Sequence, residues 1–214
     1  MNSRWFLVRH GETEWNSTGR AQGQADTPLN ARGRAQAALT GTRLAPLQFE
    51  AVYSSDLSRV SDTAEAIVED KDLTITKMES LREKGFGEWE GMTFAEVEKH
   101  HPSLFRRLFD EDIEFAPPGG ESDQQLYDRL QSAKEELVAA HPDSDGNILI
   151  VAHGGSLRAL IACMMDMPPE YMWRLRLSNC SLTVINMFDG GAALELLNDT
   201  SHLGDIIKDF ADGS

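Results

Sequence analysis

The stretch LVRHGE at residues 7–12 ends a short apolar run with a cation, an imidazole and a glycine. The apolar residues from Trp5 to Val8 are typical of a buried strand, and Gly11 marks the turn that ends it. A strand of this kind should end in turn residues, whereas here Arg9 and His10 stand directly at its end. We therefore expect the strand to hold Arg9 and His10 at one edge of a sheet.

A second strand end has the same design. In ILIVAHGGSLRAL, residues 148–160, a buried apolar run ends in His153 and is followed by two glycines and a helical pattern. Gly154 and Gly155 allow a close approach of the backbone, and the free N–H groups of a helix start favour an anion. The sequence therefore predicts a second histidine at the same sheet edge, beside an anion site.

A third strand end occurs in AVYSSDLSRVSDTAEAI, residues 51–67. The strand ends near Ser54, and Asp56 is placed to cap the helix that follows. Arg59 begins the second turn of that helix and is expected to point toward the same edge. In parallel sheets, ligands bind beyond the carboxyl ends of the strands, where these residues would meet.

Apolar runs and helical patterns alternate along the chain. Strands are predicted at Trp5 to Val8, Ala51 to Ser54, Leu73 to Thr76, Ile148 to Ala152, Leu182 to Met187 and Leu194 to Leu197. Helices are predicted at Ala31 to Leu44, Leu57 to Val68, Phe94 to Asp110, Asp123 to Ala140 and Leu157 to Met165. This alternation favours an α/β fold with three α/β/α layers around a mostly parallel central sheet.

The length of 214 residues suits one domain that spans residues 1–214. Residues 81–142 have few strand signals, and we expect them to form a helical insertion over the active-site edge of the sheet. Ser122 followed three residues later by Gln125 predicts a capping box at the start of the long helix. Residues 209–214, DFADGS, are expected to be a frayed tail.

Composition narrows the classes of partner. The formal net charge of −15 argues against nucleic acid or an anionic membrane as a partner, because both require a cationic face. No stretch approaches the roughly 18 apolar residues of a membrane span, and Arg9 and His10 interrupt the only N-terminal apolar run, so we expect a cytoplasmic protein. The two cysteines, Cys163 and Cys180, are expected to be buried thiols without a disulfide.

The residue types at these strand ends suit phosphoryl transfer. A neutral imidazole nitrogen is a nucleophile near pH 7, and a covalent intermediate divides one difficult displacement into two easier ones. His10 is the candidate nucleophile. Planar guanidinium groups, here Arg9 and Arg59, can stabilise the equatorial phosphoryl oxygens with paired hydrogen bonds and without a metal. We therefore predict neither a metal site nor a cofactor.

Five motifs occur in one order along most of the chain: RHGETEWN at 9–16, QG at 22–23, SSDLSRVSDTA at 54–64, LREKGFGEWEG at 81–91 and VAHGG at 151–155. Together they resemble the histidine phosphatase superfamily, also called the phosphoglycerate mutase-like family. The resemblance implies a phosphoglycerate mutase-like fold, with His10 phosphorylated and Arg9, Arg59 and His153 around the phosphoryl group. It also implies that the phosphate is contacted by Asn16, Gln22, Gly23 and the backbone of Gly154.

A general acid should protonate the leaving alkoxide. The segment LREKGFGEWEG is similar to the phosphatase branch of the family, in which the glutamate at the place of Glu83 is the proton donor. To donate, Glu83 must be protonated in the substrate complex, which needs burial or a nearby anion. Glu88 and Glu90 remain alternative acids, and Glu12 is expected to orient or balance the cationic residues.

Two enzyme classes compete, a phosphomonoesterase and a cofactor-dependent phosphoglycerate mutase. The segment after Leu81 favours the phosphatase branch, in which the chain is similar to bacterial α-ribazole, phosphoserine and broad-specificity phosphatases. A non-catalytic phosphate-binding module is the third alternative. The motifs do not separate the substrates, because they describe the phosphate end of the site, and a homodimer is neither predicted nor excluded by them.

Other residues have simpler explanations. Arg106 and Arg107 could reach a second anionic group of a substrate, although solvated helix charges are the simpler explanation. Met172 and Trp173 lie in a Met-rich segment that is typical of core packing but could line a substrate pocket. We expect a small-molecule phosphomonoester to be the partner.

Overall fold

A computed structural model describes residues 2–108 and 112–206 of the protein. These residues form a six-stranded sheet in the order β3-β2-β4-β1-β5-β6. The strands are β1 (Asn2–Arg9), β2 (Ala51–Ser54), β3 (Ile75–Lys77), β4 (Asn147–Ala152), β5 (Leu182–Phe188) and β6 (Gly191–Asp199). The first four run parallel to one another, and β5 and β6 pair in antiparallel fashion. The predicted mostly parallel sheet is confirmed.

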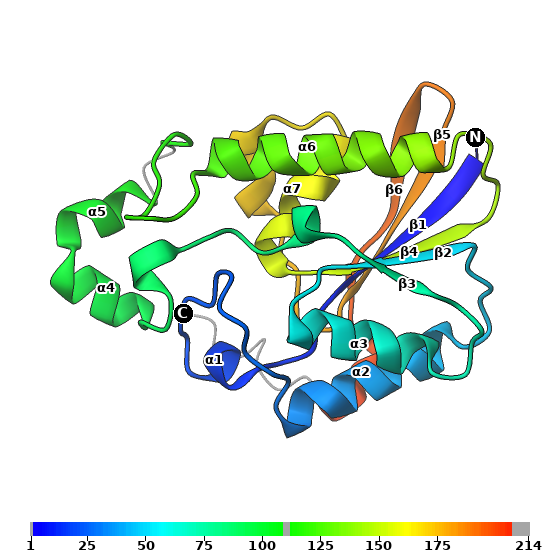
Figure 1. Ribbon diagram of the computed structural model, residues 1–214, viewed down its shortest axis with the longest axis horizontal. Helices are drawn as coiled ribbons and strands as arrows, with labels where there is room; N and C mark the ends of the chain where they lie inside the picture. Colours follow the sequence, from blue (N-terminus) through cyan, green and yellow to red (C-terminus); the bar gives the residue numbers. More distant parts are fainter. Residues whose placement is uncertain (1, 109–111, 207–214) are drawn as a thin grey trace.

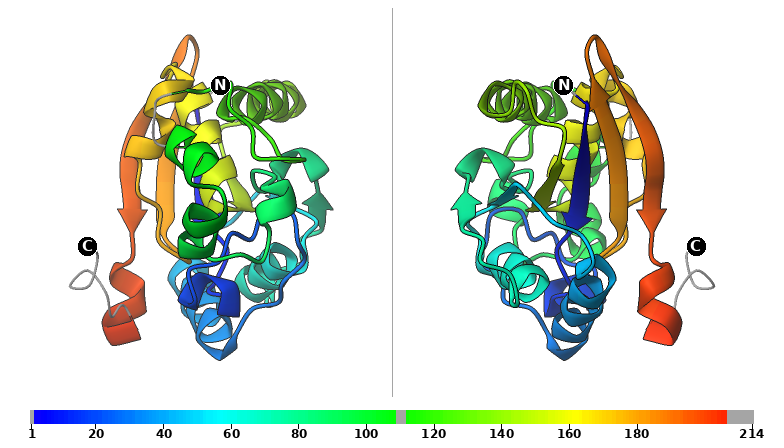
Figure 2. Two further views of the ribbon diagram at one scale, coloured as in Figure 1. Left: turned by 90° about the vertical axis from the view of Figure 1, so that its left-hand side faces the viewer. Right: turned by 90° about the vertical axis from the view of Figure 1, so that its right-hand side faces the viewer.

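Helices cover both faces of this sheet (Figure 1). The α-helices are α1 (Glu14–Ser17), α2 (Ala31–Leu44), α3 (Ser58–Val68), α4 (Phe94–His100), α5 (Pro102–Arg107), α6 (Asp123–Ala140) and α7 (Gly154–Met164). Short 3-10 helices lie at η1 (Glu79–Leu81), η2 (Gly87–Trp89), η3 (Pro169–Arg174) and η4 (Ser201–Ile206). The side views show the two layers of helices with the strands between them (Figure 2). The three-layer α/β/α fold predicted from the sequence is therefore confirmed.

The alternation of side chains along β1 explains why the sheet is covered on both faces. Trp5 and Leu7 belong to a core with α6 and α7, whereas Phe6 and Val8 belong to a second core with α2 and α3. Successive strand residues point to opposite faces, so a continuous apolar run needs a partner layer on each side. The buried strand is thus a rigid mount for Arg9, its last residue.

The long helix α6 begins at the predicted residue, because Ser122 and Gln125 form the expected capping box. Its residues Leu126 and Leu130 are buried in the core that α7 shares. By contrast, α4 and α5 extend beyond the sheet, on the left in Figure 1, and have a small core of their own around Trp89 and Val97.

Four local expectations were wrong or incomplete. One helix over Phe94 to Asp110 is instead two helices, broken at His101 (φ −135°), because a residue before proline is pushed out of the helical region; positions 109 and 110 lie outside the described residues. The helix predicted from Leu157 begins earlier, at Gly154. Asp56 does not cap α3 and instead accepts hydrogen bonds from Arg82. The short α1 was not predicted.

Candidate active site

The end of β1 places His10 inside the protein. Its side chain is 2% exposed, and Nδ1 lies 2.7 Å from the carbonyl oxygen of Gly11. A carbonyl can only accept, so Nδ1 must carry the hydrogen, and in the neutral ring Nε2 is left with a free electron pair. The local fold therefore selects the tautomer in which Nε2 can act as a nucleophile.

The surroundings keep the His10 ring neutral. Burial lowers its pKa well below 6.5, and the charges of Arg59 and Arg9 lower it further, against a smaller opposing effect of the Gly11 hydrogen bond. A neutral imidazole is the form that can attack phosphorus. Burial, together with the two arginines, thus keeps His10 unprotonated at neutral pH, and the arginines also attract an anion toward it.

Arg59, on α3, is fully buried. It donates from Nη1 to the carbonyl of Ala25 (2.8 Å) and from Nη2 to the carbonyl of Gly23 (2.9 Å), while Nε is buried without a partner among the described residues. Gly23 has φ +53°, and a Cβ there would lie 2.0 Å from Oε1 of Glu90, so this turn requires glycine. Gly23 thus supports Arg59 through its carbonyl.

Arg9 is held in a similar way. Its Nη1 donates to the carbonyl of Leu177 (2.8 Å), and its Nε is also buried without a partner in the described part of the chain. Burial, followed by the charge of Arg158, lowers the pKa of Arg9 to about 10. The guanidinium remains charged at neutral pH. Its Nε lies 3.3 Å from the position a Cβ would take on Gly154, which puts Arg9 against the start of α7.

His153 follows β4 and caps α7. Its ring lies 5.2 Å from that of His10, centroid to centroid, and its Nε2 lies 2.9 Å from Oγ of Ser55. Burial and then the charge of Arg59 hold the pKa of His153 well below 6.5. The structure therefore brings together the four side chains predicted from three strand ends, and we call Arg9, His10, Arg59 and His153 the strand-end cluster.

Glu83 reaches the same helix start from a loop after η1. Its carboxylate accepts hydrogen bonds from the N–H groups of Gly155 (3.0 Å), Ser156 (3.1 Å) and Lys84 (2.9 Å). A Cβ on Gly155 would lie 2.3 Å from Oε1 of Glu83, so a glycine is required for this approach. Glu83 is therefore placed beside the strand-end cluster, at the point where a helix start favours negative charge.

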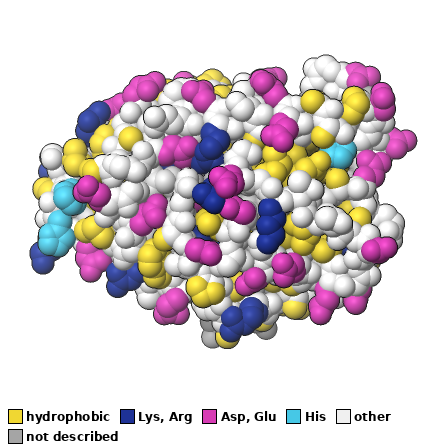
Figure 3. Space-filling view, in the orientation of Figure 1, with side chains coloured by type: hydrophobic (Ala, Val, Ile, Leu, Met, Phe, Trp, Pro, Cys, Tyr) yellow, Lys and Arg dark blue, Asp and Glu magenta, His cyan; other side chains and the backbone are white. Residues whose placement is uncertain are grey.

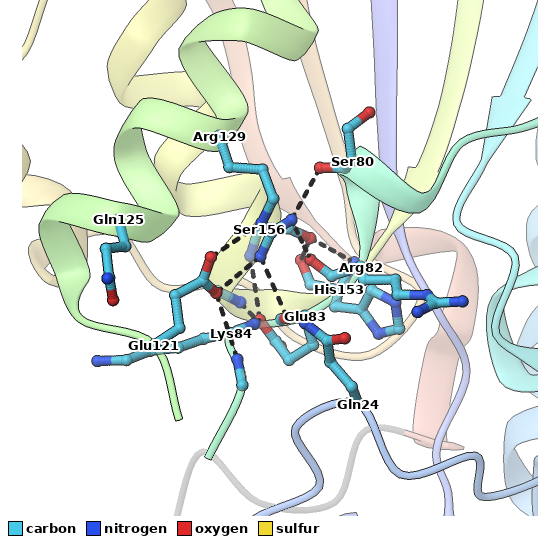
Figure 4. Close-up of polar contacts among 12 residues, drawn as sticks. Gln24, Ser80, Arg82, Glu83, Lys84, Glu121, Gln125, Arg129, His153 and Ser156 are labelled. Carbon is cyan, nitrogen blue, oxygen red and sulfur yellow. Dashed lines mark hydrogen bonds and ion pairs between the residues drawn. The ribbon is translucent and has the colours of Figure 1, made fainter. Parts of the chain in front are cut away.

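Arg129 on α6 fixes the segment that carries Glu83 (Figure 4). It donates to the carbonyls of Ser80 (2.8 Å), Arg82 (2.9 Å) and Glu83 (3.3 Å), and it pairs with Glu121 at 2.8 Å. One guanidinium thus holds the backbone on both sides of Arg82. Nothing in the motifs singled out Arg129, because its role comes from the packing of α6 beside η1.

Asn16 and Gln22 lie on the chain that follows β1. The carbonyl oxygen of Gln22 accepts hydrogen bonds from the hydroxyls of Thr13 (2.8 Å) and Thr27 (2.7 Å), which leaves its NH₂ group as the donor end. Oδ1 of Asn16 accepts from Nδ2 of Asn179 (3.3 Å), and the same Nδ2 donates to the carbonyl of His10 (3.0 Å). Asn179 is a supporting residue that the sequence did not reveal.

The alternative acids are placed less well than Glu83. Glu88 is exposed, and Glu90 accepts hydrogen bonds from the N–H groups of Gln24 (3.0 Å) and Phe86 (3.1 Å) in the neighbouring loops. Glu12 does not balance the cluster as expected. It turns away past Gly11, accepts a hydrogen bond from Asn30 (2.8 Å) and pairs with Arg32 (3.1 Å) at the start of α2.

The arginines expected on the inserted segment are remote from this network. Arg106 is exposed, and Arg107 is paired with Asp112 and stacked over Phe115 at 4.5 Å. The cation that does border the cluster is Arg158 on α7, whose Nη1 lies 3.3 Å from the Cβ position of Gly154. No motif pointed to Arg158, because only the geometry of the helix start brings it to Arg9.

The strand-end cluster, with its two arginines, lies inside an acidic protein. The formal net charge is −15, and acidic side chains are scattered over the face shown in Figure 3, with a group of basic ones near its middle.

Within residues 2–108 and 112–206, no three His, Cys, Asp or Glu side chains gather as a metal site would require. The same residues contain no helix long and apolar enough to cross a membrane. Both cysteines are buried and free.

The sheet and the strand-end cluster define an α/β protein whose buried site combines two histidines and two arginines at a helix start. A family model described as "Histidine phosphatase superfamily (branch 1)" matches residues 5–200. The chain therefore belongs to the histidine phosphatase superfamily, as the motifs predicted.

The relatives divide between two activities. The chain is 35% identical to "Phosphoserine phosphatase 1" of Hydrogenobacter thermophilus, over 94% of each protein. It is 36% identical to "Probable phosphoglycerate mutase GpmB" of Salmonella choleraesuis, over 92% of this chain and 94% of that protein. Among solved structures, the α-ribazole phosphatase of Shigella flexneri is similar with a TM-score of 0.85 and 33% identity, over 92% of this chain and 96% of the other.

Proposed function

We propose that the protein is a metal-independent phosphomonoesterase that forms a phosphohistidine on His10. The observation that carries this proposal is the hydrogen bond from Nδ1 of His10 to the Gly11 carbonyl, which leaves Nε2 as the nucleophile in a buried cationic pocket. Membership of the superfamily and the phosphatases among its relatives support the same reaction.

In the first step, Nε2 of His10 forms a bond to phosphorus while the bond from phosphorus to the alcohol oxygen breaks. The unpaired Nε groups of Arg9 and Arg59 are available to the equatorial oxygens. Glu83 gives a proton to the departing oxygen, so the alcohol leaves neutral. Before that, Glu83 must take up a proton in the substrate complex, where the negative charge of the bound phosphate opposes the three N–H hydrogen bonds that favour its carboxylate form.

In the second step, a water attacks the phosphorus of the phosphohistidine. Glu83, now ionised, accepts a proton from the water as the new oxygen–phosphorus bond forms. The bond to Nε2 breaks and returns the electron pair to the imidazole. His10 ends the cycle in its starting tautomer, because Gly11 holds the hydrogen on Nδ1 throughout.

A phosphoglycerate mutase is the second candidate, favoured by the 36% identity to the protein named for that activity. A mutase must keep water from the phosphohistidine between half-reactions, whereas a phosphatase admits it. Phosphatases and a mutase both occur among the relatives, so the identity values do not separate the two activities. We favour hydrolysis because the segment around Glu83 resembles the phosphatase branch.

The test is turnover of p-nitrophenyl phosphate and 3-phosphoglycerate by protein treated with a chelator. We expect release of inorganic phosphate from the aryl ester, and an acid-labile phosphoryl label on the wild type that His10→Ala lacks. Interconversion of phosphoglycerates, primed by a bisphosphoglycerate and faster than phosphate release, would make the protein a mutase instead. Label retained in His10→Ala would move the nucleophile to another residue.

A further inference from the structure

A cavity of about 560 Å³ lies between α4, the start of α6 and η3. Its apolar lining consists of Phe86, Phe94, Leu108, Ile113 and Trp173, and we call it the apolar cavity. Two of these rings are unusually open for such large side chains, with Phe94 41% and Trp173 42% exposed. A cavity of this size, lined mainly by aromatic and aliphatic groups, suits a small organic ligand.

The apolar cavity adjoins the proposed reaction centre through Trp173. The Cβ position of Gly155 lies 2.3 Å from Oε1 of Glu83 and 3.5 Å from Cη2 of Trp173, so carboxylate and indole flank the same point of α7. Lys84, the next residue after Glu83, also lines the cavity. The cavity therefore begins on the side of Glu83, where an alcohol protonated by Glu83 would extend.

The charged groups of the cavity are largely neutralised. Lys84 is only 2% exposed, and its Nζ lies 2.5 Å from Oδ1 of Asp123. The other oxygen of Asp123 accepts a hydrogen bond from Nε1 of Trp173 (2.7 Å). The lysine is thus not free to bind an anion, and it fixes Asp123 and Trp173 as a rigid wall. The remaining charged residue of the cavity lining is Glu170, which would repel an anion.

We propose that the apolar cavity binds the alcohol part of the substrate, and that this part is bulky, uncharged and apolar, with an aromatic ring preferred. The proposal rests on the proposed phosphomonoesterase function and names its substrate class. The rings of Phe86, Phe94 and Trp173 offer stacking and edge contacts to a flat group. A small zwitterionic alcohol, such as the serine of phosphoserine, would leave these surfaces unfilled, and Glu170 would repel its carboxylate.

The test compares two esters whose alcohols differ only in the apolar group, propyl phosphate and 3-phenylpropyl phosphate. Both are primary alcohols of similar acidity, so the demands on His10 and Glu83 are the same. One methylene in an apolar pocket is worth about tenfold or more in kcat/KM, so we expect the phenyl ester to be favoured by at least about tenfold. O-phosphoserine should be no better than propyl phosphate.

Two variants test whether the preference for the phenyl ester depends on the apolar cavity. Phe94→Ala and Trp173→Phe should each reduce the ratio of kcat/KM between the two esters, the first by roughly tenfold, as expected for loss of an aromatic contact. The matched control is Phe188→Ala, since Phe188 is similarly exposed (43%) but lies on β5 outside the cavity. It should leave the ratio unchanged.

Binding of the two corresponding phosphonates, measured by calorimetry, gives a readout that does not need turnover. The inference is wrong if the phenyl compound is favoured by less than tenfold in both measurements, if both cavity variants keep the preference, or if O-phosphoserine is the better substrate. Absence of turnover for every ester, with the phosphonate preference intact, would contradict the proposed hydrolysis and leave the cavity assignment standing.

Discussion

The strand-end cluster and the apolar cavity lie next to each other and are built in opposite ways. The cluster consists of buried or half-buried polar side chains from strand ends and helix starts. Arg9, His10 and Arg59 are fixed by hydrogen bonds to backbone carbonyls, and His153 by a hydrogen bond with the Ser55 hydroxyl. The cavity consists of partly exposed aromatic side chains from segments distant in sequence. The proposed chemistry therefore rests on rigid backbone mounts, whereas the proposed selectivity rests on side chains that can be exchanged without disturbing the sheet.

Removal of the proposed nucleophile should have the largest effect, and the loss should be the same for alkyl and aryl esters. His10→Ala should lower kcat/KM by about 10⁵-fold or more for alkyl and aryl phosphates alike, because no other group forms the phosphoryl intermediate. Steady-state kinetics on propyl phosphate and p-nitrophenyl phosphate measure this loss of kcat/KM. Glu12→Ala is the control and should retain most activity, since Glu12 pairs with Arg32 away from the cluster. Comparable losses in both variants would contradict the assignment.

Removal of the acid should separate the leaving groups. Glu83→Gln should slow hydrolysis of propyl phosphate by about 10²–10⁴-fold, the usual contribution of a proton donor, and should slow hydrolysis of p-nitrophenyl phosphate much less. Nitrophenolate leaves without protonation, which gives the reason for the difference. Rates on both esters, compared as a ratio, are the measurement. Equal losses would mean that Glu83 is not the acid.

Arg129 is expected to act through Glu83 as a positioning residue. Arg129→Ala should shift the segment from Ser80 to Glu83, and a misplacement of about 1 Å can cost up to 10²-fold, so we expect a loss of roughly 10- to 100-fold on propyl phosphate. The loss should be smaller on p-nitrophenyl phosphate. The control is Arg4→Ala, which breaks an exposed pair with Glu195 near the start of β1, at the end of the strand opposite to Arg9. A loss equal on both esters would indicate general destabilisation instead.

The smallest predicted effect concerns stability and pH. His10 and His153 have pKa values well below 6.5 in the folded protein, so the unfolded chain takes up their protons first as the pH falls. Stability should be full above about pH 6.5 and decline below it, by up to about 1.4 kcal/mol per pH unit for each histidine. Urea unfolding between pH 7.5 and 5.5 measures the slope. His153→Asn should reduce the slope, and an unchanged slope in this variant would contradict the prediction.

The sequence predicted the parts of the molecule that depend on local pattern. His10 and His153 follow apolar runs directly, so the runs that predict β1 and β4 also place both rings at one edge. Helix α6 was predicted with its correct bounds, because a capping box and apolar periodicity agree there. Glu83, by contrast, was assigned by resemblance, since no local pattern distinguishes it from Glu88 or Glu90.

What the sequence did not predict arises from contacts between distant segments. Arg129 and Arg158 look like ordinary helix charges until α6 and α7 are packed beside the loops they contact. Asp56 was expected to cap a helix, but Arg82, 26 residues further on, takes its carboxylate. The break at His101 could have been found, because Pro102 follows it. The contacts of Arg129, Arg158 and Asp56, by contrast, are with distant segments and are known only from the tertiary structure.

The unpaired Nε atoms of Arg9 and Arg59 have a consequence for the stability of the folded protein. Two guanidinium groups of like charge, each with a buried and unused Nε donor, make the folded state less stable than it would be with an anion bound to both. An anion that binds only the folded state raises the unfolding temperature by mass action. Inorganic phosphate, the product of the proposed hydrolysis, is such an anion. Phosphate would stabilise the folded state and also compete with the substrate, so the same two arginines would link thermal stability to product inhibition.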